Sequence, residues 1–218
     1  MNWVKNWIPA IIFTLIPLSF LLAIEKEEDL LGKFLERHKH IQTFQADFLQ
    51  RNIWPELDTE KYSEGTLYTK GNWIRMEYKS PDQELMIGND ERLLFYFPKE
   101  RQVIFQNPNY WQSLLSPSRF ANEYINYCIL DSMESKQGRV VFYFTPTEEM
   151  SDFTDIVIMF SQADSLVSYF GYKDIYDNSV QYNFSNLKIN QQIPDSLFFF
   201  EVPQGVKIID QRTYNDEP

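Results

Sequence analysis

Short segments in which apolar and polar residues alternate dominate this sequence from residue 44 onward, and they indicate a fold built on a β-sheet. In the first segment Phe44, Ala46 and Phe48 fall on one face, while Gln45 and Asp47 fall on the other, as in a strand with one buried side. The other predicted strands are 62–68, 73–78, 83–87, 92–97, 102–106, 126–131, 139–145, 155–160, 166–172 and 180–189. Short strands with turn-forming residues between them are typical of an antiparallel meander.

A helical pattern precedes these strands. Between residues 29 and 40, apolar positions that include Leu30 and Phe34 recur at helical spacing. Two short helical turns are predicted over 110–115 and 118–122, where the rhythm of the strands is interrupted. We therefore predict a mainly β (α+β) protein, in which the helices cover one opening or face of the sheet.

Residues 1–23 have the pattern of an export signal. A basic residue is followed by the apolar segment 8–24 and then at once by acidic residues. We predict cleavage after Ala23, which leaves one domain over 24–218. The alternative is an uncleaved membrane anchor, but the apolar segment is at the short end for a spanning helix and contains two prolines.

The charge and the aromatic content limit the classes of partner. The formal net charge is -11, which argues against nucleic acid and against an anionic membrane surface, because both attract clustered Lys and Arg. Aromatic residues make up 17% of the chain, and they supply large apolar areas for a core or a ligand cavity. The composition therefore favours an apolar ligand over a polyanionic one.

The residues that usually carry catalysis are scarce. The single cysteine, Cys128, stands in an apolar run that predicts a small buried hydrophobe. His38 and His40 are two positions apart on the predicted helix, so they face different directions and make a poor metal pair. Carboxylates lie in turns and termini, although a glycosidase pair depends on separation in space. We predict a binding protein rather than an enzyme, without metal or cofactor.

Three parts of the chain resemble the LolA family of periplasmic lipoprotein carriers. Residues 44–50 (FQADFLQ) match the family's Phe-x-Ala-x-Phe-x-Gln opening strand. Residues 65–68 and 74–90 are similar to its glycine-led strand, its Arg-x-x-Tyr strand and the following hairpin. Residues 200–209 (FEVPQGVKII) resemble its Phe-x-x-Pro-x-Gly-Val ending. The three parts occur in the order and with the spacing of the family, and together they extend over nearly the whole mature chain.

The resemblance implies an incomplete antiparallel β-barrel of about eleven strands, closed by lid helices over a hydrophobic cavity. The cavity would take acyl chains of lipoproteins from an inner-membrane transporter and pass them to an outer-membrane acceptor. We expect a periplasmic monomer. Many members hold the lid with an Arg-Pro pair that aligns with Lys70-Gly71 here, and lysine lacks the planar fork needed for a bidentate latch. Lys70 and Arg75 are the candidate latch residues.

The candidate acyl-chain site consists of large apolar and aromatic side chains on predicted strands and on the predicted lid. They are Phe44, Phe48, Ile74, Met76, Tyr78, Met86, Leu94, Tyr96, Phe105, Trp111, Leu114 and Leu115. Flexible Met side chains would adapt to chains of varied shape. Ordinary core packing is the alternative for each position. A binding module for another lipid or a signalling peptide, on the same half-barrel, is the alternative function.

Overall fold

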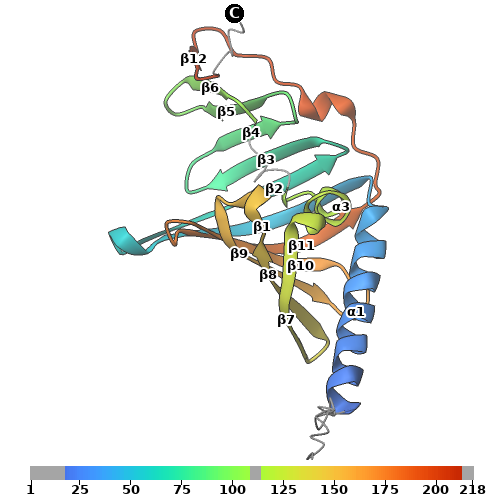
Figure 1. Ribbon diagram of the computed structural model, residues 1–218. Helices are drawn as coiled ribbons and strands as arrows, with labels where there is room; N and C mark the ends of the chain where they lie inside the picture. Colours follow the sequence, from blue (N-terminus) through green and yellow to red (C-terminus); the bar gives the residue numbers. More distant parts are fainter. Residues whose placement is uncertain (1–17, 109–113, 213–218) are drawn as a thin grey trace, which may run out of the picture.

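The computed structural model describes residues 18–108 and 114–212, which form one large open sheet with helices on its inner side (Figure 1). The twelve strands lie in the order β12-β6-β5-β4-β3-β2-β1-β11-β10-β9-β8-β7. All neighbours are antiparallel except β12 and β6, which are parallel. The chain thus runs outward from the central β1 to β6, and then inward from the edge strand β7 to β11. The prediction of a mainly antiparallel sheet is confirmed.

The first group of strands comprises β1 (Thr43–Trp54), β2 (Thr59–Lys70), β3 (Trp73–Ser80), β4 (Glu84–Gly88), β5 (Leu93–Phe97) and β6 (Gln102–Gln106). The second group comprises β7 (Cys128–Lys136), β8 (Arg139–Pro146), β9 (Phe153–Ser161), β10 (Val167–Asp174), β11 (Ser179–Ile189) and β12 (Lys207–Asp210). Eleven of these correspond to predicted strands. The twelfth, β12, was not among them, because its four residues become a strand only by pairing with the exposed edge of β6.

Helices α1 and α3 accompany the sheet. Helix α1 (Leu18–Lys39) is longer than the predicted 29–40 helix, because it begins within the apolar segment that precedes Asp29. Helix α3 (Pro117–Asn122) agrees with the predicted turn over 118–122 and begins at a proline, which is favoured in a first helical turn. The other predicted turn, 110–115, lies mostly outside the described residues. Within the described chain, no helix combines the length and hydropathy that a membrane span requires.

Short 3-10 helices also occur among the described residues. They are η1 (Pro55–Leu57), η2 (Tyr124–Tyr127), η3 (Glu148–Met150) and η4 (Asp195–Phe198). Of these, η4 belongs to the segment 190–206, which joins β11 to β12 and which we call the C-terminal strap. Figure 1 shows the strap passing along the sheet on its way from β11 to β12.

The two faces of the sheet carry separate apolar layers. We call the face that bears Phe44, Ala46 and Phe48 the inner face, and it packs with α1 and α3 into the main core. The opposite, outer face is apolar mainly over β4 to β6, where Ile87, Leu94 and Val103 are buried outside that core. Aromatic rings of the strap cover this area: the rings of Tyr96 and Phe200 lie 4.9 Å apart.

Candidate functional site

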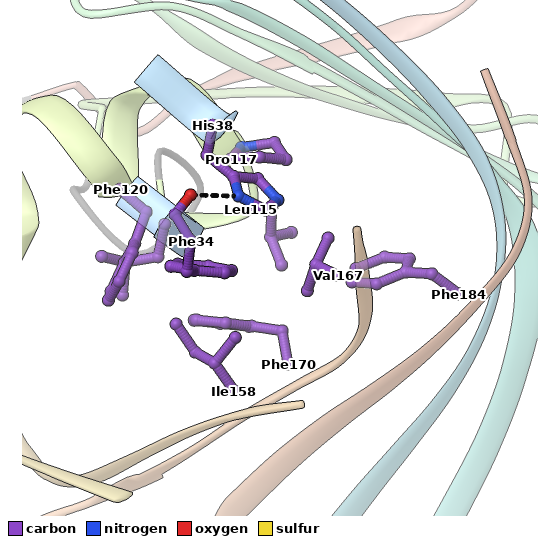
Figure 2. A pocket seen from close by; sticks show the side chains of 10 residues that line it. Phe34, His38, Leu115, Pro117, Phe120, Ile158, Val167, Phe170 and Phe184 are labelled. Atoms are coloured by element: carbon purple, nitrogen blue, oxygen red, sulfur yellow. Dashed lines mark hydrogen bonds between the residues drawn. The ribbon is translucent and has the colours of Figure 1, made fainter. Parts of the chain in front are cut away.

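A small apolar pocket lies between the inner face of the sheet and the segment 114–122, which includes α3 and which we call the lid (Figure 2). The sheet contributes Ile158, Val167, Phe170 and Phe184 from β9, β10 and β11. Helix α1 and the lid contribute Phe34, His38, Leu114, Leu115, Pro117 and Phe120. The imidazole of His38 is the one polar side chain in this lining.

Helix α1 is fixed to the sheet by aromatic packing. The ring of Phe34 lies 4.9 Å from that of Phe160 and 5.9 Å from that of Phe142, in geometries that aromatic pairs favour. One turn later, His38 is completely buried, and its Nδ1 lies 2.9 Å from the carbonyl oxygen of Phe34. Burial lowers the pKa of His38 to about 4, so the imidazole is neutral at neutral pH.

The lid is held in place by a few polar contacts at its surface. Arg119 on α3 bonds Asp90 in the β4–β5 turn at 2.5 Å and Glu123 at 2.7 Å. Asn122 donates from Nδ2 to the carbonyl oxygen of Lys39, at the end of α1, over 3.3 Å. Beneath these contacts Phe120 packs against the rings of the second strand group. The Arg119–Asp90 pair is therefore a polar link from the lid to the first strand group.

Most predicted site residues lie on the inner face. Those that are buried there or in the lid are Phe44, Phe48, Ile74, Met76, Met86, Leu114 and Leu115. Tyr78 also faces inward and is half-buried, and its hydroxyl donates to Gln50 Oε1 over 2.9 Å. Trp111 lies outside the described residues. Leu114 and Leu115 line the pocket, whereas the sheet residues of this set belong to the core beside it.

Leu94, Tyr96 and Phe105 lie on the outer face, so we correct their predicted position. Leu94 pairs with Ile87 and with Phe105, and Tyr96 pairs with Leu85, all of which point away from Met86 and the core. Leu94 is buried on that outer face, and the ring of Tyr96 contacts Phe200 of the strap. Because β5 reads LLFYF and is apolar on both sides, alternation gave no basis for choosing a face.

The predicted latch residues bind the strap rather than the lid, which is a second correction. The Nζ of Lys70 donates to the carbonyl oxygen of Ile193 over 2.8 Å and to Asp195 over 2.7 Å. Arg75 donates to the carbonyl oxygen of Leu197 over 2.7 Å. Both side chains leave the sheet on the outer face, so neither reaches the lid.

Sequence reasoning missed the sheet side of the pocket. Ile158, Phe170 and Phe184 lie in strands that were predicted, but only the strand of Phe184 alternates clearly between apolar and polar residues, whereas β9 is apolar on both sides. The missing information was which end of the sheet the helices cover. Arg119 was also missed, because the sequence gives no sign that Asp90 would lie opposite it in space.

The pocket contains little free space. Its volume is about 20 Å³, which is room for about one water molecule. For comparison, an engineered cavity of about 150 Å³ binds one benzene molecule. The predicted hollow for acyl chains is therefore filled here by side chains of the lid, chiefly Leu114, Leu115 and Phe120.

The residue types that often carry metal binding or nucleophilic chemistry can be located in the described part of the chain. No group of three or more His, Cys, Asp or Glu residues in residues 18–108 and 114–212 is arranged to hold a metal ion. Burial raises the pKa of the Cys128 thiol to about 12, so the nucleophilic thiolate is not formed at neutral pH. His40, unlike His38, is exposed beside Glu36.

Comparison with known proteins identifies relatives of this chain. The family model described as outer membrane lipoprotein carrier protein LolA matches residues 39–201. An outer-membrane lipoprotein carrier protein of Vibrio parahaemolyticus is 31% identical over 179 residues, which covers 78% of this chain and 80% of that protein. One of Dechloromonas aromatica is 26% identical over 216 residues, covering 96% and 98% of the two chains.

The fold also occurs in a protein of unassigned function. A crystal structure of an uncharacterised conserved protein from Thermus thermophilus superposes with a TM-score of 0.53 at 9% identity. The match covers 85% of this chain and 99% of that one. At this identity the likeness concerns the fold alone.

Proposed function

Because the chain belongs to the LolA family of outer-membrane lipoprotein carriers, we propose that it binds the acyl chains of lipoproteins between the lid and the inner face of the sheet. Family members are periplasmic carriers and not enzymes. The observation that carries the proposal is an inner face rich in aromatic and aliphatic side chains, covered by a short lid whose own apolar side chains pack on that face.

Loading requires the lid to move, since the closed pocket is far too small for an acyl chain. The cargo would replace Leu114, Leu115 and Phe120 on the inner face. The acyl chains would then contact those side chains and also sheet residues of the inner face, namely Phe44, Phe48, Ile74, Met76, Tyr78 and Met86. The sheet residues of the closed pocket, from Ile158 to Phe184, are part of the same proposed surface.

This exchange explains how a carrier binds firmly and still releases its cargo. Each methylene removed from water contributes about 0.8 kcal/mol, so a chain of about 16 carbons contributes on the order of 10 kcal/mol. Exposing the apolar side chains of the lid costs part of that free energy. The net affinity is correspondingly lower, and closure of the emptied lid assists transfer to an acceptor.

The remaining features of the proposal concern the place and the partners of the carrier. Residues 1–23 would be a cleaved export signal, and the mature domain 24–218 would work as a monomer in the periplasm. An inner-membrane transporter would deliver the lipoprotein, and an outer-membrane acceptor would receive it. Helix α1 begins at Leu18, so cleavage would shorten this helix at its N-terminal end while leaving Phe34 and His38 in place.

The test measures binding of a fluorescent diacylated peptide to the mature protein and to two arginine variants. Leu114→Arg places a charge in the apolar lid and is expected to weaken binding about tenfold or more, because a charge is strongly disfavoured in such a site. Ile129→Arg, at an exposed apolar position of β7, is the matched control and should bind normally.

Mass spectrometry of lipids that co-purify with the mature protein distinguishes the alternatives. Diacylated peptides support the carrier proposal. Free phospholipid alone, with no affinity for the diacylated peptide, would favour a binding module for another lipid. Equal binding by wild type and Leu114→Arg would contradict the proposed position of the site.

A further inference from the structure

His38 presents an unusual combination, a buried imidazole with one bonded and one unbonded nitrogen. Its Nδ1 lies 2.9 Å from the carbonyl oxygen of Phe34. Because a carbonyl oxygen can only accept, Nδ1 carries the proton of the neutral ring. The other nitrogen, Nε2, is therefore a bare acceptor, and any partner of Nε2 must be a hydrogen-bond donor.

Within residues 18–108 and 114–212, Nε2 of His38 is the one buried side-chain nitrogen or oxygen that lacks a hydrogen-bond partner. Figure 2 shows Nε2 on the side of the ring opposite the Phe34 bond, facing Leu115 and Val167 in the pocket. A buried polar group without a partner is unfavourable. A phenylalanine would fill this apolar lining without leaving an acceptor unpaired.

The position of His38 suits the polar end of an inserted acyl chain. It lies in the last turn of α1, next to Lys39, whose carbonyl oxygen binds Asn122 of the lid. The molecular surface nearby is a depression lined by polar residues that include Asn72 and Asn122. A molecule with its tail in the apolar pocket would have its linkage to a head group near this end.

We propose that Nε2 of His38 accepts a hydrogen bond from an amide N–H that adjoins the acyl chain of the cargo. This inference rests on the proposed function and specifies its ligand class. A lipoprotein joins its acyl chains to a peptide, so amide N–H groups lie within a few bonds of the chains. A phospholipid with ester linkages offers no donor at the corresponding position. His38 would thereby favour lipopeptides over lipids that carry esters alone.

Two probes that differ in a single group test the proposal. N-hexadecanoylglycine methyl ester contains the amide N–H, and the hexadecanoyl ester of methyl glycolate has oxygen in its place. The wild-type mature protein is expected to bind the amide about tenfold more tightly, which corresponds to one well-formed hydrogen bond to a buried acceptor. In His38→Phe, the two affinities should agree within about twofold.

A control variant separates this role from packing. Val167→Ala removes apolar contact in the same pocket without touching a polar atom, so it should weaken both probes and keep their ratio. Thermal unfolding of each variant verifies that it is folded.

Because the chain has two histidines, nitrogen-15 spectra of histidine-labelled protein give a direct readout of the hydrogen bond to His38. The Nε2 signal of His38 should move with the amide and not with the ester, while exposed His40 stays unchanged.

The outcomes distinguish the inference from the function beneath it. If the wild type binds both probes equally, or if His38→Phe keeps the preference, the inference is wrong while the carrier proposal stands; Nε2 would then bond only a water molecule. If neither probe nor a diacylated peptide binds, the carrier proposal and the inference both fail.

Discussion

At the residue scale, His38 makes the stability of the protein depend on pH. The pKa of His38 is lowered from 6.5 to about 4, mainly by burial and to a smaller extent by the charge of Arg37, against the opposing effects of the Phe34 carbonyl and of Asp164. Between these two pH values the unfolded chain binds a proton that the folded chain does not. The free energy of unfolding therefore falls as the pH decreases from about 6.5 to about 4. Over this pH range the free energy of unfolding falls by on the order of 3 kcal/mol.

Urea unfolding at pH 7.5 and at pH 4.5 tests this dependence. His38→Phe should lose less stability over that interval than the wild type, by about 2 kcal/mol, because phenylalanine takes up no proton. His40→Phe is the matched control, since its side chain is exposed, and it should behave like the wild type. If His38→Phe and the wild type lose equal free energy of unfolding between the two pH values, His38 is hydrated or protonated in the folded state.

At the element scale, the lid is joined to the first strand group by the pair Arg119–Asp90. Arg119 is 13% exposed and Asp90 is 51% exposed, so the pair contributes about 1 kcal/mol to closure. Asp90→Asn removes the charge and should raise the rate of acyl-chain uptake about fivefold, because opening of the lid precedes binding. Stopped-flow fluorescence with a labelled fatty acid measures this rate.

The strap provides a control of the same chemistry. Asp195→Asn weakens the ion pair with Lys70 on the outer face and should leave the uptake rate unchanged. Faster uptake in Asp195→Asn, with no change in Asp90→Asn, would mean that Lys70 controls the lid from the outer face, as its alignment with the family arginine first suggested.

The sequence predicted which segments form strands, but it did not always predict which face of a strand points into the core. Alternation in residues 44–50 and 73–78 predicted β1 and β3 because each has one polar side. The segment LLFYF of β5 is apolar on both sides, and each side has one buried residue, Leu93 in the main core and Leu94 on the outer face. The functions of Lys70 and Arg75 could not be predicted either, because they depend on the path of the strap, more than a hundred residues later.

At the scale of the whole molecule, the unpredicted property is the volume of the interior. Composition showed that the chain has enough aromatic area for a ligand cavity. It could not show that Leu114, Leu115 and Phe120 would fill this cavity in the closed form. In the proposed function, the same side chains would serve as core when the lid is closed and as the wall of a binding site when it opens. Both states are therefore compatible with one apolar sequence pattern.

The net charge of -11 leads to the last prediction. A carrier that moves between membranes must not remain on either of them, and a negative surface is repelled by anionic lipids. At neutral pH and low ionic strength, the empty mature protein should therefore not sediment with vesicles that contain phosphatidylglycerol. Below about pH 4.5, where carboxylates take up protons, sedimentation should increase. Vesicles of phosphatidylcholine alone are the control. Binding to anionic vesicles at pH 7.5 that salt abolishes would reveal a basic surface that outweighs the net charge.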